Sequence, residues 1–164
     1  MKITRLLPLL FFIGFISIAA SAQTSASVVK IKPEQSVYKV KQGSPFQVGV
    51  VLEIDGGYHI NSNTPSEPFL IATKLKIDPL TGLRVNAVRY PKAKVQKFEF
   101  SEKPMSVYEG RVVLRFTARS LAGLQVGNHT ITGKLTIQAC DDKACLRPQT
   151  VDVKIPLEVA APNS

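Results

Sequence analysis

The chain has 164 residues, and 21 Lys and Arg against 12 Asp and Glu give it a formal net charge of +9. The lysines between Lys30 and Lys97 are scattered and often alternate with apolar residues, a pattern typical of the solvated face of strands. They are not gathered into a patch with interleaved stacking aromatics, so the charge does not predict a nucleic-acid partner.

The first 22 residues have the three parts of a secretory signal peptide. A basic start at residues 1–5 precedes an apolar run over residues 6–20, and Ala-Ser-Ala at 20–22 is a small-x-small cleavage pattern. An apolar run of about 15 residues is shorter than the roughly 20 needed to span a bilayer. We therefore expect cleavage before Gln23 rather than a retained membrane anchor.

Cleavage would remove 22 of the 164 residues and leave 142, residues 23–164, as one domain. A domain of this size can bury a core without needing disulfides. Lys2 and Arg5 would leave with the signal, which lowers the formal charge from +9 to +7. No later stretch is apolar enough to span a bilayer, so we expect an exported protein without stable membrane insertion.

The rest of the chain is typical of an all-β protein, with eight to ten short strands, frequent turn signals and no helical period. The clearest alternation covers residues 46–54, where every second residue is apolar, and Asp55-Gly56-Gly57 follows as a turn. This pattern predicts an antiparallel sandwich or barrel in a single domain. The expected strands are residues 28–32, 36–40, 46–54, 58–61, 69–77, 83–90, 95–100, 111–118, 128–140 and 150–159.

The two cysteines, Cys140 and Cys145, lie in a segment that we call the cysteine hairpin, residues 138–148. It is predicted to form a strand, a tight turn and a return strand. Directly opposed residues of an antiparallel pair have Cα atoms about 4.5–5.5 Å apart, which suits a disulfide. Cys140 has the same strand parity as the polar Thr136 and Gln138, so its sulfur is expected to face outward unless a bulge intervenes.

The register of this hairpin needs a slip of one residue. Pairing Cys140 with Cys145 sets Leu135 opposite Thr150, whereas the apolar face of the last strand begins at Val151. We expect a bulge near Pro148 to supply the slip, because proline cannot donate to the strand ladder.

The residues by themselves leave the role of the pair open. In an exported, often oxidising compartment, two nearby cysteines form a disulfide by default. A six-residue closed loop contributes about 2 kcal/mol, against about 4.7 kcal/mol for a hundred-residue loop, so the bridge is a weak staple. Two hypotheses stand at this point: a redox pair for thiol–disulfide exchange, or a binding module with a structural hairpin disulfide.

Other chemistry is sparse in the sequence. The cysteine spacing is not the Cys-x-x-Cys of thioredoxins. His59 and His129 could join the cysteines in a zinc site, but they lack ligand spacing, and we expect no metal. We also expect no cofactor, because no phosphate loop or nucleophile elbow is present. Asp141 and Asp142 are most simply turn residues.

Several ordered segments resemble the N-terminal periplasmic domain of the DsbD family of disulfide reductases. The similarity covers essentially the whole chain after the signal, and the ordered set that ends in the cysteine hairpin carries it. The matching segments are residues 57–62, 69–73, 98–100, 107–110 and 138–148.

The resemblance implies a periplasmic, immunoglobulin-like antiparallel β-sandwich whose cysteine pair transfers electrons as part of a protein-disulfide reductase. In that family the domain is reduced by a thioredoxin-like domain fed through a membrane domain. It then reduces disulfide isomerases and proteins of cytochrome c maturation. The present chain stops at Ser164, so we expect thioredoxin-fold proteins and a membrane electron-conducting protein to act in trans.

The resemblance also assigns roles to residues. Cys145 is implied as the nucleophile that attacks the partner's disulfide, and Cys140 as the resolving thiol. Phe100, with Glu99, resembles the cap loop that shields the sulfurs. Three further residues fall where family members place aromatic or polar side chains beside the pair: Tyr58, His59 and Asn61.

Overall fold

The computed structural model describes residues 23–162, which fold into strands and one short 3-10 helix, η1 (Ser25–Ser27). The expected signal peptide, residues 1–22, lies outside the described residues. Within residues 23–162, no helix is long and apolar enough to cross a membrane.

The first layer of the sandwich is a four-stranded antiparallel sheet. Its strands, in order across the sheet, are β1 (Val29–Pro33), β3 (Pro45–Ile54), β9 (Arg111–Ser120) and β6 (Leu83–Val85). β3 confirms the alternation predicted for residues 46–54, and Val48, Val50 and Leu52 on its inner face are fully buried.

The second layer is a four-stranded sheet dominated by one long antiparallel pair. Its strands, in order, are β2 (Tyr38–Lys41), β12 (Gln149–Ala160), β10 (Gly127–Ile137) and β5 (Lys74–Ile77). β2 is parallel to β12, and the other pairs are antiparallel.

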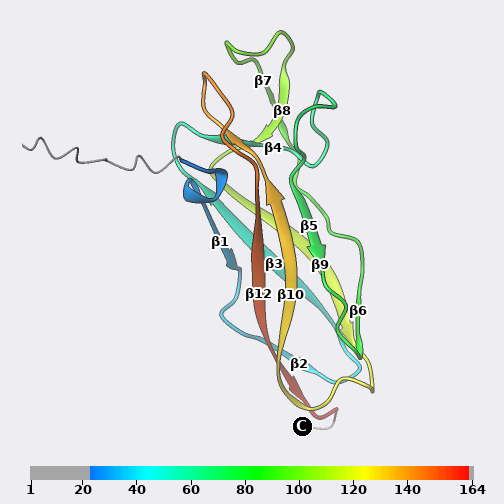
Figure 1. Cartoon of the computed structure of the whole chain (residues 1–164). Coiled ribbons are helices and arrows are strands. Elements are labelled where there is room, and N and C mark those ends of the chain that lie inside the picture. Colours follow the sequence, from blue (N-terminus) through cyan, green and yellow to red (C-terminus); the bar gives the residue numbers. More distant parts are fainter. Residues whose placement is uncertain (1–22, 163–164) are drawn as a thin grey trace, which may run out of the picture.

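The core lies between these two layers, and Figure 1 shows β10 and β12 crossing in front of β3 and β9. Buried residues of both sheets join in one apolar cluster, in which Leu114 and Phe116 of β9 pack with Ile131 and Leu135 of β10 and Ile155 of β12. Burial of such alternating faces is the main source of stability in a sandwich. The predicted all-β sandwich is confirmed, and its fold is immunoglobulin-like.

A third, smaller sheet lies at the end of the sandwich opposite β2 (Figure 1). Its strands, in order, are β11 (Ala139–Cys140), β4 (His59–Asn61), β8 (Met105–Tyr108) and β7 (Lys94–Gln96). All of its neighbouring pairs are antiparallel. This sheet holds one half of the disulfide.

The strand expected over residues 69–77 is wrong in its first half, because only Lys74–Ile77 forms a strand, β5. In the preceding segment, the backbone at Ile71 forms its hydrogen bonds with side chains and not with a neighbouring strand. Asn61 Nδ2 donates to the carbonyl of Ile71 at 3.1 Å, and the amide of Ile71 donates to Gln138 Oε1 at 3.1 Å. Phe69, at the start of the expected strand, is 76% exposed.

Two other expected strands are also shorter than the sequence indicates, and a third is divided. Residues 83–90 and 95–100 contribute only β6 and β7. The run 128–140 is divided, because β10 ends at Ile137 and β11 begins at Ala139. At Gln138, between them, the carbonyl accepts from the amide of Asn61 at 3.2 Å, so the chain turns there from the sandwich to β4.

Candidate functional site

The cysteine hairpin closes on a disulfide between Cys140 and Cys145, whose Cα atoms are 3.8 Å apart. Asp141 shapes the turn, as predicted. Its Oδ1 accepts hydrogen bonds from the amides of Lys143 at 2.8 Å and Ala144 at 2.7 Å. These backbone hydrogen bonds are the main reason that the pKa of Asp141 is lowered.

The one-residue slip predicted for this hairpin is confirmed. In the sandwich Ile137 pairs with Gln149, while Cys140 pairs with Cys145 at the tip. Two residues on the outgoing side therefore oppose three on the return side, so the extra residue lies within 146–148. The predicted position near Pro148 agrees with this count.

Cys140 is fully buried, which corrects the expectation that its sulfur faces outward. Ala139 and its partner Ile60 join the sandwich core, so Cys140 lies on the opposite face of β11, as its parity requires. On that face His59 lies directly opposite Cys140, and Phe98, from the loop after β7, stacks on the His59 ring. Cys145, in contrast, is partly exposed.

The N-terminal segment braces the hairpin from the other side. Ser25, in η1, is fully buried although its side chain is polar. Its hydroxyl donates to the carbonyl of Arg147 at 2.8 Å and accepts from the amide of Ala139 at 2.9 Å. The sequence did not predict this role of Ser25. A serine close to the expected cleavage site gives no indication of a contact more than one hundred residues away along the chain.

Three nearly parallel rings, His59, Phe98 and Phe100, form what we call the aromatic stack. The ring centroids of His59 and Phe98 are 3.9 Å apart with planes at 16°, and those of Phe98 and Phe100 are 5.8 Å apart with planes at 21°. His59 is 2% exposed, Phe98 4% and Phe100 37%, so the stack runs from the interior to the surface.

His59 is directly opposite Cys140 in the pairing of β4 with β11. Opposed residues of an antiparallel pair project on the same face of the sheet. The stack therefore begins beside the disulfide. The turn at 55–58 sets this register: Gly57 has a φ of 81°, and the amide of Tyr58 donates to the carbonyl of Asp55 at 3.1 Å.

The structure thus gathers some of the predicted neighbours of the cysteines and not others. His59 and Phe100 belong to the stack, and Asn61 braces the approach to the hairpin by donating to Gln138 Oε1 at 3.1 Å. Tyr58 packs on the core and its hydroxyl donates to Gln23 Oε1 at 3.2 Å. Glu99 points to solvent.

Phe98 is the residue of the stack that the prediction missed as a site residue. The sequence pattern that could have indicated Phe98 is its spacing of two residues from Phe100 in Phe98-Glu99-Phe100. That pattern places two aromatics on one side without indicating that a histidine from another strand packs against them.

A cavity of about 310 Å³ reaches His59 from the side. His59, Tyr58 and Phe98 line it together with the acidic residues Glu109 and Asp142. Burial lowers the pKa of His59, and the negative charges of Glu109, Asp142 and Asp141 oppose that shift. The imidazole is therefore neutral at neutral pH, with carboxylates placed to favour its charged form when it takes a proton.

The buried imidazole makes stability depend on pH. Its pKa in the folded protein is below its unfolded value of about 6.5, so the unfolded chain takes up this proton first as the pH falls. We expect the free energy of unfolding to be unaffected by His59 above about pH 7. Below that it should decrease by at most about 1.4 kcal/mol per pH unit, until the folded pKa is passed.

Urea titrations of the oxidised protein and of His59→Phe at several pH values would measure this. The difference between the two should be flat above pH 7 and steep below it. Equal pH dependence in both proteins would contradict the shift.

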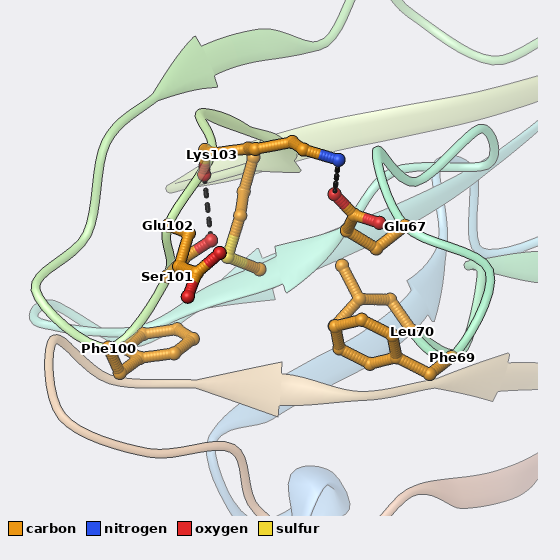
Figure 2. Close-up of a pocket in the computed structure, with 8 residues that line it drawn as sticks. Glu67, Phe69, Leu70, Phe100, Ser101, Glu102 and Lys103 are labelled. Atoms are coloured by element: carbon orange, nitrogen blue, oxygen red, sulfur yellow. Dashed lines mark hydrogen bonds and ion pairs between the residues drawn. The ribbon is translucent and has the colours of Figure 1, made fainter.

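A second cavity, of about 330 Å³, lies on the outer side of the stack. Figure 2 shows Phe100 facing Phe69 and Leu70 across it. Lys103 and Glu67 form an ion pair at 2.9 Å over one edge. The cavity therefore has an apolar lining next to the aromatic stack, and this lining includes Phe69, which is 76% exposed.

The zinc alternative finds no support in the part of the chain that the structure describes. There, no group of three or more His, Cys, Asp or Glu side chains is arranged to hold a metal ion. His129 lies near the start of β10, with its Nε2 2.7 Å from the carbonyl oxygen of Gln125, while the cysteine hairpin follows the other end of that strand.

Comparison with families of known proteins gives an informative match. A family model described as "Thiol:disulfide interchange protein DsbD, N-terminal" matches residues 28–157. No curated protein matches the chain. A solved structure of a family 123 glycoside hydrolase from Clostridium perfringens is similar to 82% of this chain, which spans 27% of that chain, at 8% identity and a TM-score of 0.36. A likeness this weak carries no functional argument.

Proposed function

The chain belongs to the family of N-terminal domains of the thiol:disulfide interchange protein DsbD, and on this premise we propose that its Cys140–Cys145 pair relays electrons to disulfide-bonded partners. The observation that carries the proposal is the unequal burial of the two cysteines. Cys140 is fully buried and Cys145 is partly exposed, so a partner can reach only one end of the bridge.

The exchange has two steps. In the reduced domain the Cys145 thiolate attacks one sulfur of the partner's disulfide, which forms a mixed disulfide and releases the partner's second sulfur as a thiolate. Cys140, deprotonated, then attacks the Cys145 sulfur, closes the Cys140–Cys145 bond and releases the partner's first sulfur. Two electrons pass to the partner, and its two thiolates take up the two protons that the domain's thiols lose.

The aromatic stack is proposed as the cap of this site. Phe100 forms its outer end and Glu99 lies exposed beside it, as the cap loop of the family implies. A partner's disulfide approaching Cys145 displaces Phe100, while His59 and Phe98 stay buried. Shielding of this kind protects the thiols from nonspecific oxidants between encounters.

The partners proposed are thiol–disulfide proteins of the periplasm. A thioredoxin-like protein, supplied with electrons by a membrane protein in trans, reduces the domain. Disulfide isomerases or proteins of cytochrome c maturation receive the electrons. Family membership supports thiol–disulfide partners, and the expected signal peptide supports an exported, periplasmic domain of residues 23–164.

The reduction potential of the Cys140–Cys145 bridge tests the proposal. Structural disulfides of exported proteins have reduction potentials below about −300 mV, whereas cysteine pairs that exchange electrons have higher reduction potentials. We expect a value above about −300 mV from equilibration with glutathione or dithiothreitol buffers, read by thiol alkylation. A value well below that limit would favour a binding module with a structural disulfide instead.

A further inference from the structure

In the resolving step the thiol of Cys140 loses its proton although the residue is fully buried. Cys140 is fully buried, and burial without a partner disfavours a charged thiolate. Cys145 can lose its proton to solvent because it is partly exposed. Cys140 needs an acceptor within the protein.

His59 is the group that the fold places opposite Cys140, on the same face of the third sheet. It is 2% exposed, and its Nε2 is buried with no hydrogen-bond partner among residues 23–162. A buried polar atom left unpaired costs about 1–3 kcal/mol, so such atoms are rare and call for an explanation. A second buried group without a bond here, Asn61 Oδ1, is an acceptor only and cannot carry a proton at this pH.

We propose that His59 takes the proton of the Cys140 thiol when Cys140 resolves the mixed disulfide on Cys145. The inference rests on the proposed exchange function. The sulfur–hydrogen bond of Cys140 breaks, its electron pair forms the new bond to the Cys145 sulfur, and the proton passes to the imidazole. The bond between Cys145 and the partner breaks, and the departing thiolate takes a proton from the imidazolium or from water. No other oxidant or reductant is needed.

The surroundings of His59 suit it both to accept the proton and to carry the positive charge that follows. The ring of Phe98 is stacked on the imidazole at 3.9 Å, which holds the plane of the imidazole on the face of β4 that His59 shares with Cys140. Burial keeps the imidazole neutral and able to accept a proton, while the negative charges of Glu109, Asp142 and Asp141 stabilise the positive charge that it gains.

The cavity of about 310 Å³ gives that proton a way out. His59 lies on its wall together with Asp55, Tyr58, Glu109 and Asp142. The charged groups on it are acidic and suit the passage of a cation.

Ellman's reagent separates the two steps in one experiment. The fully reduced protein should release one equivalent of nitrothiobenzoate when Cys145 attacks the reagent. A second equivalent follows when Cys140 resolves the mixed disulfide. Cys140→Ser should show the first phase only, which assigns the phases, and stopped-flow absorbance measures both rates.

His59→Phe keeps a flat ring in the stack but removes the proton acceptor. We expect its first phase to stay within about twofold of wild type and its second phase to be slower by about 10- to 100-fold at pH 7. The deficit should shrink above about pH 9, where a larger fraction of the thiol is ionised without the help of a base. His59→Gln, which is polar and smaller, should show the same pH-dependent deficit if the aromatic variant folds poorly.

His129→Gln is the matched control, because it removes the other histidine far from the hairpin and should leave both phases unchanged. A second phase in both His59 variants that keeps the wild-type rate would overturn the inference. So would a deficit equal at every pH, since that marks a purely structural role. A wild-type protein that releases no second equivalent would overturn the exchange function itself.

Discussion

Replacing Cys145 by Ser is expected to abolish exchange with thioredoxin-fold partners, whereas Cys140→Ser should accumulate a mixed disulfide with them. The reason is access. Cys145 is partly exposed at the tip of the cysteine hairpin, and Cys140 is fully buried beside His59. A serine hydroxyl does not replace the thiolate, so the exchange rate of Cys145→Ser should fall by a factor on the order of 10³ or more.

The measurement is a trapping assay. Each single variant, reduced, is mixed with an oxidised thioredoxin-fold protein, quenched with acid and alkylated, and the product is read on a non-reducing gel. Cys140→Ser should give a covalent complex that dithiothreitol dissolves, and Cys145→Ser should give none. The double variant, Cys140→Ser with Cys145→Ser, is the blank.

The opposite pattern, with a complex formed only by Cys145→Ser, would reverse the roles assigned to the two cysteines. If neither single variant forms a complex, the exchange function is contradicted and the binding module is favoured. These outcomes are separate from the proton step at His59, because trapping requires only the first attack.

The largest effect on stability is expected from Phe116→Ala. Phe116 is 1% exposed, lies opposite Val48 in the pairing of β9 with β3, and belongs to the core between the two layers. Truncating a buried phenylalanine removes its transfer free energy and leaves a cavity in a close-packed interior, at a cost of about 3–5 kcal/mol. That is a large share of the roughly 5–15 kcal/mol that stabilises an ordinary domain.

Phe69→Ala is the matched control, because it is the same chemical change at a residue that is 76% exposed. Its free energy of unfolding should stay within about 0.5 kcal/mol of wild type. Urea unfolding followed by circular dichroism measures both. Equal losses in the two variants would contradict the assignment of Phe116 to the core.

Two features of the fold, strand β3 and the register of the cysteine hairpin, could be predicted closely from the sequence. The alternation over residues 46–54 gave β3 almost to the residue, because period 2 follows from strand geometry alone. The slip in the cysteine hairpin also followed from sequence. Leu135 and Val151 must share the core face, while Cys140 and Cys145 must face each other.

Strand ends were harder to predict, and residues 69–73 show why. Their apolar alternation favours a strand, yet the side chains of Asn61 and Gln138 bond the backbone at Ile71 and take the place of a ladder. Such bonds join segments ten and sixty-seven positions apart, so no local pattern records them.

The sequence by itself therefore determined the class of fold, the cysteine pair, its turn and its register. Only the tertiary structure decided that Cys140 is buried. Strand parity says to which face a side chain points, not what covers that face. Here β4 and the loop that carries Phe98 and Phe100 come from far along the chain and place a histidine and two aromatic rings on the side where solvent was expected.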